Sequence, residues 1–187
     1  MNIMIVGVGG QGTLLTSRII GKTALSAGYD VKISEVHGMA QRGGSVVTYV
    51  RYGERISEPI VEEGGADILL AFERLEALRY AHYLKKDGVL IVNDCRIDPM
   101  TVTIGAAQYP DDILEELQKE HTVYAINGDK IAQEIGSVKV LNSVVLGLAA
   151  KYMEFSEEKW LEVLCATVPQ KTVEMNTQAF KAGYENK

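Results

Sequence analysis

The sequence predicts an α/β fold: a Rossmann-like open sheet, mainly parallel, with helices on both faces, an inserted β-hairpin and a helical C-terminal segment. Apolar runs of strand length alternate along the chain with stretches of helical periodicity. The first apolar run leads straight into Gly7-Val8-Gly9-Gly10-Gln11-Gly12, and a helical pattern follows at once. From about residue 140 onward the pattern is helical only.

Continuous apolar or β-branched runs predict the strands. Residues 3–6 are apolar throughout, which is typical of a central parallel strand buried on both faces. Gly53-Glu54 favours a turn into a short returning strand near Ile56, and this pair of strands would form the hairpin. Asp87-Gly88 favours another turn before the next strand. The expected strands are residues 3–6, 31–36, 46–52, 67–72, 89–92 and 122–126.

Apolar residues three and four apart predict the helices. Gly28 is typical of a helix C-terminal cap, Ser156 of an N-terminal cap, and Pro169 of a first helical turn. The small residues around Gly147 favour close packing against a neighbour. Residues 94–108 receive no assignment. The expected helices are residues 11–27, 75–84 and 111–120, one that opens at 127–129, and several after about 140.

The chain has 187 residues, which is enough for one domain with a substantial core. No linker, low-complexity tract or internal repeat divides it, so residues 1–187 are expected to form a single domain. No apolar run approaches the roughly 20 residues that span a bilayer. The short N-terminal run has no basic segment before it and ends in glycines, unlike a signal peptide. We therefore expect a cytoplasmic protein that does not bind membranes.

Charge and cysteine content exclude further classes of function. The net charge of −6 argues against non-specific binding to nucleic acid, which requires a basic surface. The only two cysteines, Cys95 and Cys165, lack metal-ligand spacing. They cannot hold a four-cysteine iron–sulfur cluster or a zinc site in this chain alone, and we expect two reduced core thiols and no metal.

The first glycine loop has the strand–loop–helix context of a phosphate cradle. In that context Gly7 would permit the tight turn, Gly9 would let the backbone approach a pyrophosphate, and Gly12 would let helix and strand pack closely. The helix N-terminus adds free N–H groups and a partial positive charge. Glu35 lies near the end of the second expected strand, about where dinucleotide-binding folds place a ribose-binding acid. A loop that binds nothing is the alternative.

A second loop, from His37 to Gly44, combines a titratable side chain, a guanidinium and three glycines. Arg42 is suited to clamp a carboxylate or phosphate, and His37 to act near neutral pH. Direct contact with a ligand and docking on a partner subunit remain equal alternatives for this loop.

Further polar residues follow two expected strands, where ligands lie in open α/β sheets. Glu73 and Arg74 follow one, and Asn93 and Asp94 follow the next. No Ser/His/Asp or Cys/His constellation is present, so the chain does not look like a complete catalyst. Candidates for a catalytic role are His37 and Arg42. The candidate cofactor-binding residues are Gly7, Gly9, Gly10, Gln11, Gly12, Glu35, Gln41, Arg42, Gly43 and Gly44.

The two loops together resemble the gamma-type domain of the 2-oxoacid:ferredoxin oxidoreductases. The second loop, His37-Gly-Met-Ala-Gln-Arg-Gly-Gly44, discriminates within that family and is most similar to the branch that oxidises indolepyruvate. Gamma chains that serve pyruvate or 2-oxoglutarate usually read differently before the Arg-Gly pair. The resemblance extends through residues 45–52, 66–72, 88–93 and the helix that contains Asn142 and Gly147, so it covers most of the chain.

The resemblance implies a subunit of an enzyme that decarboxylates a 2-oxoacid oxidatively, passes electrons to ferredoxin and transfers the acyl group to coenzyme A. Thiamine diphosphate and the iron–sulfur clusters are expected on a large alpha subunit, and no cofactor on this chain alone. Asn127-Gly128-Asp129 is not the usual thiamine diphosphate signature. Gly7–Gly12 would face coenzyme A phosphates or the partner, and Glu35, His37, Gln41 and Arg42 would shape the entrance to the thiamine site.

Two other functions compete with this one. One is a stand-alone reductase that binds NAD(P) or a flavin with the same glycine loop, and it requires nucleotide affinity in the isolated chain. The other is a purely structural assembly subunit whose glycine loop is empty. A gamma subunit for pyruvate or 2-oxoglutarate is a further alternative within the family.

Overall fold

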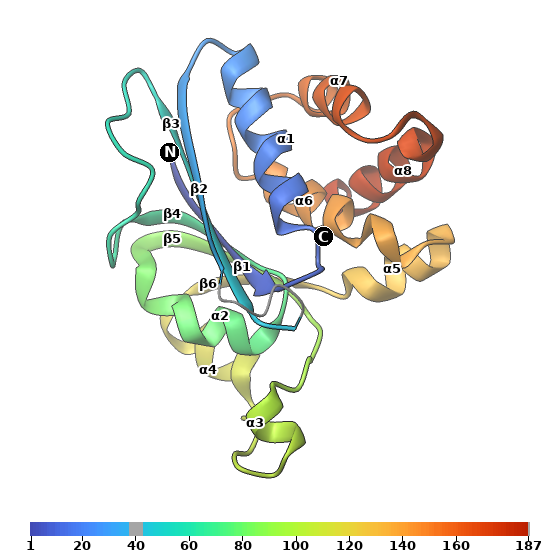
Figure 1. Cartoon of the computed structure of the whole chain (residues 1–187). Coiled ribbons are helices and arrows are strands. Elements are labelled where there is room, and N and C mark those ends of the chain that lie inside the picture. Colours follow the sequence, from blue (N-terminus) through green and yellow to red (C-terminus); the bar gives the residue numbers. More distant parts are fainter. Residues whose placement is uncertain (38–42, 187) are drawn as a thin grey trace.

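The computed structural model describes residues 1–37 and 43–186. One six-stranded sheet runs through the molecule in the order β2-β3-β1-β4-β5-β6 (Figure 1). This confirms the predicted Rossmann-like α/β fold with a mostly parallel open sheet. The strands are β1 (Asn2–Val8), β2 (Asp30–His37), β3 (Ser45–Gly53), β4 (Ala66–Ala71), β5 (Leu84–Asn93) and β6 (Thr122–Ile126).

Helices cover both faces of the sheet. In Figure 1, α1 and the C-terminal helices lie on one side, whereas α2 and α4 lie on the other. No helix in the described part of the chain is both long enough and apolar enough to cross a membrane. The helices are α1 (Thr13–Ser26), α2 (Arg74–Tyr80), α3 (Met100–Thr103), α4 (Ile113–Glu120), α5 (Gly128–Ile135), α6 (Leu141–Ala150), α7 (Glu157–Thr167) and α8 (Val173–Tyr184), with 3-10 turns η1 (Ala81–Tyr83), η2 (Val138–Val140) and η3 (Gln170–Thr172).

The inserted hairpin is real, but its position differs from the prediction. β3 runs antiparallel to both β1 and β2 and lies between them, so β2 and β3 form the hairpin. The returning strand expected near Ile56 is wrong: residues 54–65 contain no strand. The reason is that both edges of β3 are already paired, one with β1 and the other with β2, which leaves no edge for a strand near Ile56.

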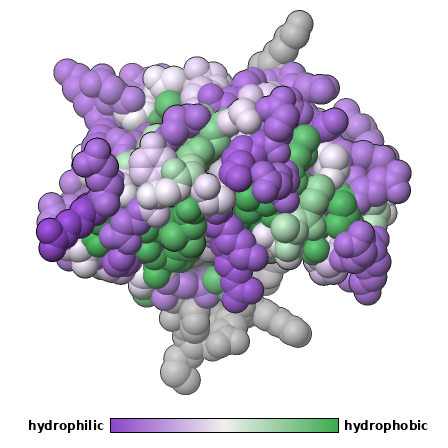
Figure 2. Space-filling model, turned by 90° about the horizontal axis from the view of Figure 1, so that it is seen from above, coloured by the Kyte–Doolittle hydropathy of each residue, from purple (hydrophilic) through white to green (hydrophobic). Residues whose placement is uncertain are grey.

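Two apolar cores sit on the two faces of the sheet. Alternate residues of β1 point to opposite faces, as the pleat requires. Ile3 and Ile5 pack into the core beneath α1, α6, α7 and α8, whereas Met4 and Val6 pack into the core beneath α2 and α4. Viewed from above Figure 1, hydrophilic side chains cover most of the surface and hydrophobic ones show between them in separate groups (Figure 2).

Local departures from the sequence pattern have packing reasons. β5 begins at Leu84, so the turn expected at Asp87-Gly88 is wrong and these residues lie within the strand. The pairing of β4 with β5 shifts register between Ala66 and Ile68, and this irregularity lets Asp87 and Gly88 stay within β5 instead of forming a turn. The helix expected to end at Leu84 ends as α2 at Tyr80 and continues as η1.

The C-terminal helices α6 and α8 touch backbone to backbone. A Cβ atom added to Gly147 would lie 2.0 Å from the carbonyl oxygen of Phe180, and one added to Gly183 would lie 1.9 Å from that of Val144. Close packing around Gly147 is thus confirmed, and the neighbour is a helix of the same chain. Because α6 also packs against the sheet, this contact holds the C-terminal helices to the core.

We predict that Gly147→Ala destabilises the chain by about 3 kcal/mol or more, because the helices must separate to admit the methyl group. Thermal unfolding followed by circular dichroism should show a midpoint lowered by about 6–12 °C. Gln178→Ala, at an exposed position of α8, is the matched control and should unfold like the wild type. A Gly147→Ala midpoint equal to the wild-type value would contradict this packing.

Candidate functional site

The first glycine loop joins β1 to α1 and leaves backbone N–H groups unpaired. Gly12 is the N-cap residue of α1 and no side chain caps the helix there. Gly10 has a φ angle of 107° and Gly12 one of 87°, conformations that favour glycine. The N–H groups of Gly10 and Gly12 have no acceptor among the described residues. Those of the first helical turn have none within the helix, so the loop presents donors suited to an anion.

The individual glycines do not play the parts that the motif predicts. Gly7 lies inside β1 rather than in the turn, and close packing explains it: an added Cβ would lie 2.9 Å from Gln11 Oε1 and 2.9 Å from Phe72 Cβ. The left-handed conformations belong to Gly10 and Gly12. At Gly12, close packing also matters, because a Cβ there would lie 2.9 Å from Cβ of Asn142 on α6.

The structure joins the two glycine loops of the sequence. The Gly9 N–H donates to the carbonyl oxygen of Gly44 at 2.9 Å, and the Gly43 N–H donates to that of Gly9 at 3.5 Å. This contact follows from the register of the sheet, in which Val8 is opposite Ser45. His37 is the last residue of β2, and the predictions for Gln41 and Arg42 lie outside the described residues.

A pocket of about 490 Å³ opens beside the first loop, on the face of the sheet that α1 covers. Its lining combines residues of the loop with Arg18 of α1, Glu35 of β2 and Val46 of β3. Glu35 thus lines a pocket beside the glycine loop, although β3 separates its strand from β1, and its role in binding a ligand stays a prediction. The lining residues are Gly9, Gly10, Gly12, Thr13, Leu14, Leu15, Arg18, Glu35 and Val46.

Arg18 is the residue that the sequence analysis missed. Its side chain is exposed and forms no ion pair or hydrogen bond with any described residue. It lies one turn after Leu14 on the helix face that lines the pocket. A cation beside free N–H groups suits a phosphate. The helical spacing from the loop was the available signal for Arg18, but only the fold shows that this face of α1 looks into a pocket.

A second pocket, of about 440 Å³, lies on the other side of the same loop. It combines the side chains of Cys95, Asp129, Lys139 and Asn142 with Gly10–Gly12. Asn142 is 3% exposed, and its amide Nδ2 has no hydrogen-bond partner among the described residues. Lys139 forms no ion pair with any residue that the structure describes, so this pocket also offers donors and a positive charge.

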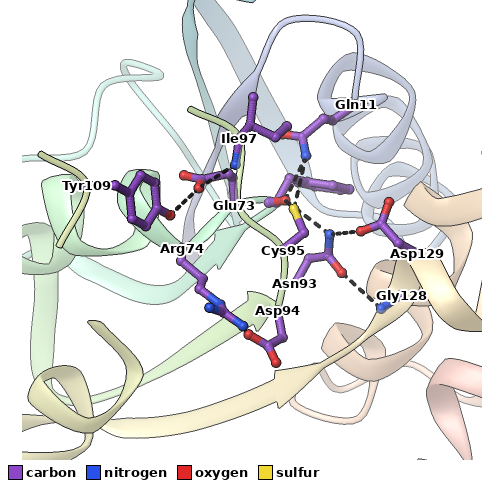
Figure 3. Close-up of polar contacts among 11 residues, drawn as sticks. Gln11, Glu73, Arg74, Asn93, Asp94, Cys95, Ile97, Tyr109, Gly128 and Asp129 are labelled. Carbon is purple, nitrogen blue, oxygen red and sulfur yellow. Dashed lines mark hydrogen bonds and ion pairs between the residues drawn. The ribbon is translucent and has the colours of Figure 1, made fainter. Parts of the chain in front are cut away.

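Buried hydrogen bonds connect the segments beneath the first glycine loop, at the ends of β4 and β5 (Figure 3). The Asn93 side chain donates to the Phe72 carbonyl at 3.2 Å and to Asp129 at 2.9 Å, and it accepts from the Gly128 N–H at 2.9 Å. Asn93 therefore ties the ends of β4 and β5 to the start of α5. Its predicted position near the site is confirmed, but its polar atoms are occupied by the protein.

The carboxylate of Glu73 accepts hydrogen bonds from the segment that follows β5 and holds this segment in place. Glu73 is 1% exposed and accepts from the Tyr109 hydroxyl at 2.5 Å, from the Ile97 N–H at 3.2 Å and from the Glu76 N–H at 3.0 Å. It thus caps α2 and fixes both ends of residues 97–109 (Figure 3). Arg74 beside it pairs with Asp94. Glu73 and Arg74 lie at the predicted edge of the sheet, but their side chains are bonded to other residues of this chain.

A third pocket, of about 310 Å³, contains Glu76 beside the described end of the second loop. Glu76 is 4% exposed, and burial raises the pKa of its carboxyl, opposed by the hydrogen bond from Ser45 and the charge of Arg79. The Ser45 hydroxyl donates to Glu76 at 2.5 Å, and Arg79 lies 3.3 Å from it. Glu76 therefore anchors the start of β3 directly after Gly44.

The described residues do not fit the redox cofactors of the resembling family. No group of three or more His, Cys, Asp or Glu side chains in the described ranges is placed to hold a metal ion. Cys95 lies beneath the first loop, and burial raises its pKa to about 12, whereas Cys165 lies on α7 beside Thr177. Two separated thiols are too few ligands for a four-cysteine iron–sulfur cluster.

Fold and site together define a Rossmann-like α/β protein whose first glycine loop lies between two pockets. The family model "pyruvate ferredoxin/flavodoxin oxidoreductase" matches residues 2–186, and the chain belongs to this family. It is 46% identical over 189 residues to the indolepyruvate oxidoreductase subunit IorB of Archaeoglobus fulgidus, covering 98% of this chain and 94% of that protein. The IorB subunit of Thermococcus kodakarensis is 44% identical, with 97% and 93% covered. The resemblance seen in the two loops is confirmed.

Solved structures agree with the fold. The gamma subunit of the keto/oxoacid ferredoxin oxidoreductase of Geobacter sulfurreducens is 26% identical with a TM-score of 0.72, and 98% of this chain and 96% of that chain are covered. The 2-oxoglutarate:ferredoxin oxidoreductase of Magnetococcus marinus gives a TM-score of 0.75 at 22% identity, covering 98% of this chain but 30% of that one. The same fold therefore also occurs as part of a longer chain.

We predict that Glu76→Gln stabilises the chain increasingly as pH rises above 4.5, the ordinary value of a Glu carboxyl. A pKa raised by folding means that the buried group resists ionisation, so its ionisation costs stability at higher pH. Urea unfolding at pH 4, 5, 6 and 7 measures the difference between variant and wild type. Gln118→Ala, at an exposed site on α4, is a control without a titratable side chain and should give a difference independent of pH. A gain in the free energy of unfolding from Glu76→Gln that shrinks as pH rises would contradict a raised pKa of Glu76.

Proposed function

We propose that this chain is the small subunit of a 2-oxoacid:ferredoxin oxidoreductase that acts on indolepyruvate or related aryl pyruvates. The reaction converts the 2-oxoacid and coenzyme A into acyl-coenzyme A and CO₂, and its two electrons reduce ferredoxin. Support for the substrate comes from the IorB subunits at 44–46% identity, which cover nearly the whole chain. A 2-oxoglutarate synthase subunit KorC of Methanothermobacter marburgensis is less similar, at 33%.

The large subunit would carry thiamine diphosphate and the iron–sulfur clusters in this proposal. Thiamine diphosphate supplies the carbanion chemistry of decarboxylation, and the clusters carry single electrons. The present chain would bind and orient coenzyme A beside them. Its lack of a cysteine set for a cluster agrees with that division of labour.

The observation that carries the role in coenzyme A binding is the donor set at the first loop. Gly10, Gly12 and the first turn of α1 line the same pocket as the unpaired Arg18, and the N–H groups of Gly10 and Gly12 have no acceptor among the described residues. Coenzyme A carries a diphosphate and a 3′-phosphate, which such donors bind. Glu35 on the opposite wall is suited to accept from a ribose hydroxyl or an adenine amino group.

The second loop would meet the large subunit in this proposal. Gly43 and Gly44 are bonded to Gly9, so the described end of this loop lies next to the coenzyme A pocket. We therefore retain His37, Gln41 and Arg42 as the residues that shape the entrance to the thiamine site. The proposal unites the two alternatives for this loop, ligand contact and docking.

The competing reductase function has less support. In a dinucleotide-binding fold the ribose-binding acid ends the strand next to β1. Here the neighbour of β1 at that edge is β3, which presents Val46 to the pocket, and Glu35 lies one strand further away. Titration of the isolated chain with NADH, NADPH and FMN should accordingly give no binding, and tight binding of any of them would favour the reductase.

We predict that the chain co-expressed anaerobically with its large partner subunit gives an enzyme that reduces ferredoxin in a reaction dependent on coenzyme A. Indolepyruvate should be oxidised with a higher kcat/KM than pyruvate or 2-oxoglutarate. Reduced ferredoxin is followed by its absorbance, and omission of the small subunit is the control. A preference for pyruvate or 2-oxoglutarate would contradict the substrate, and full activity of the large subunit alone would contradict the role.

We predict that Arg18→Ala raises the KM for coenzyme A by about tenfold, because one charge-assisted hydrogen bond to phosphate is lost. The KM for the 2-oxoacid and the kcat at saturating coenzyme A should stay within about twofold. Lys22→Ala is the matched control, since Lys22 lies one turn further along α1 and contacts Thr167 instead. Equal KM values for coenzyme A in both variants and the wild type would remove this pocket from the proposal.

A further inference from the structure

We propose that Gln11 is a positioning residue that fixes the conformation of the first glycine loop, and that it does not touch the ligand. This inference rests on the proposed function, since the loop that it positions is the one assigned to coenzyme A. The side chain of Gln11 reaches down to the ends of β4 and β5 and meets Cys95 and the Phe72 carbonyl there (Figure 3).

Both ends of the Gln11 amide are engaged by groups that fix its orientation. Its Oε1 accepts from the Val8 N–H at 2.7 Å, and its Nε2 donates to the Phe72 carbonyl at 2.8 Å and to Cys95 Sγ at 3.7 Å. A flipped amide would set donor against donor at Val8 and acceptor against acceptor at Phe72. Both amide hydrogens are therefore directed into the protein, and none is left for a ligand.

Gly7 is explained by the same side chain. A Cβ on Gly7 would lie 2.9 Å from Gln11 Oε1, which is too close for an ordinary contact. The first glycine of the motif therefore leaves room for the Gln11 amide. Gly7 and Gln11, which the motif presents as separate residues, therefore act together: the missing side chain of one makes room for the amide of the other.

The carbonyl oxygen of Phe72 is the acceptor that holds the Gln11 side chain in place. It also accepts from Asn93 Nδ2 at 3.2 Å and from Cys95 Sγ at 3.2 Å, and Gln11 makes the shortest of the three contacts. Cys95 keeps its proton at neutral pH, because burial raises its pKa to about 12, and so it remains a donor. Phe72 directly follows β4, and its carbonyl is also held by Asn93, the last residue of β5, and by Cys95, which follows β5.

Gln11 closes the loop twice. Its backbone N–H donates to the Val8 carbonyl at 3.2 Å, while its side chain accepts from the Val8 N–H. Gly9 and Gly10 are held between these two bonds, and the Gly10 N–H is left without an acceptor among the described residues. The donors are thus oriented before a ligand arrives, which lowers the ordering cost of binding.

Gln11→Glu tests this role through its pH dependence. A protonated Glu side chain is an isostere of Gln: it accepts from Val8 and donates to Phe72. An ionised one sets an acceptor against the Phe72 carbonyl. In the assembled enzyme at pH 8, we expect the KM for coenzyme A to rise by about tenfold while kcat at saturating coenzyme A is kept. The ratio of variant to wild-type KM should fall towards one as pH is lowered to 5.5.

Two further variants separate positioning from a general structural role. Gln11→Met keeps the length but loses both hydrogen bonds, so its KM ratio should be raised equally at every pH. Gln133→Glu introduces the same charge at an exposed site on α5 and should leave KM unchanged. If Gln11→Glu does not assemble, Gln11→Met decides: a raised KM with kcat kept supports the inference, and an unchanged KM overturns it.

The positioning role of Gln11 and the proposed binding of coenzyme A can be contradicted independently of each other. If Arg18→Ala raises the KM for coenzyme A and Gln11→Glu does not at pH 8, Gln11 is not a positioning residue. If neither variant changes KM, coenzyme A binds elsewhere, and amide hydrogen exchange of residues 8–12 without ligand decides the matter. Faster exchange in Gln11→Glu than in the wild type at pH 8 then sustains the positioning role, and equal exchange overturns it.

Discussion

The pairing of β3 with β1 is the constraint on which the rest of the structure depends. Its register sets Val8 opposite Ser45, and this alone brings Gly43 and Gly44 against Gly9. A slip by one residue would turn every side chain of β3 to the other face, so that residues shaped for one core would point into the other. The same apolar pattern that buries β3 therefore also fixes the contact between the two glycine loops.

The site is built on rigid elements rather than on its own loops. Three contacts hold the first loop: Gln11 bonds to Phe72 directly after β4, Gly9 bonds to the second loop, and Gly12 packs against Asn142 of α6. Buried polar groups are costly unless each finds a partner, and the side-chain amides of Gln11 and Asn93 are fully paired. The unpaired N–H groups of Gly10 and Gly12 stand out against that background, which is why we assign them to a ligand.

The sequence is a good guide to the sheet and a partial guide to the site. Apolar runs predict all six strands, although β5 begins five residues earlier than expected, and they predict one extra strand near Ile56. Periodicity identifies a strand but not which edge remains free to pair. The glycine pattern predicts the loop, yet it does not reveal that Gly7 leaves room for Gln11, since that depends on Phe72, which follows another strand. Arg18 was missed for the same reason: only the packing of α1 turns it towards the pocket.

In the proposed function, this subunit would prepare a binding surface and leave the redox chemistry to its partner. The central claim is that the first loop and Arg18 bind the phosphates of coenzyme A. A structure of the assembled enzyme with coenzyme A bound tests it most directly. Our account predicts phosphate oxygens within hydrogen-bonding distance of the Gly10 and Gly12 N–H groups and of the Arg18 guanidinium. Coenzyme A held wholly by the large subunit, with this pocket empty, would contradict it.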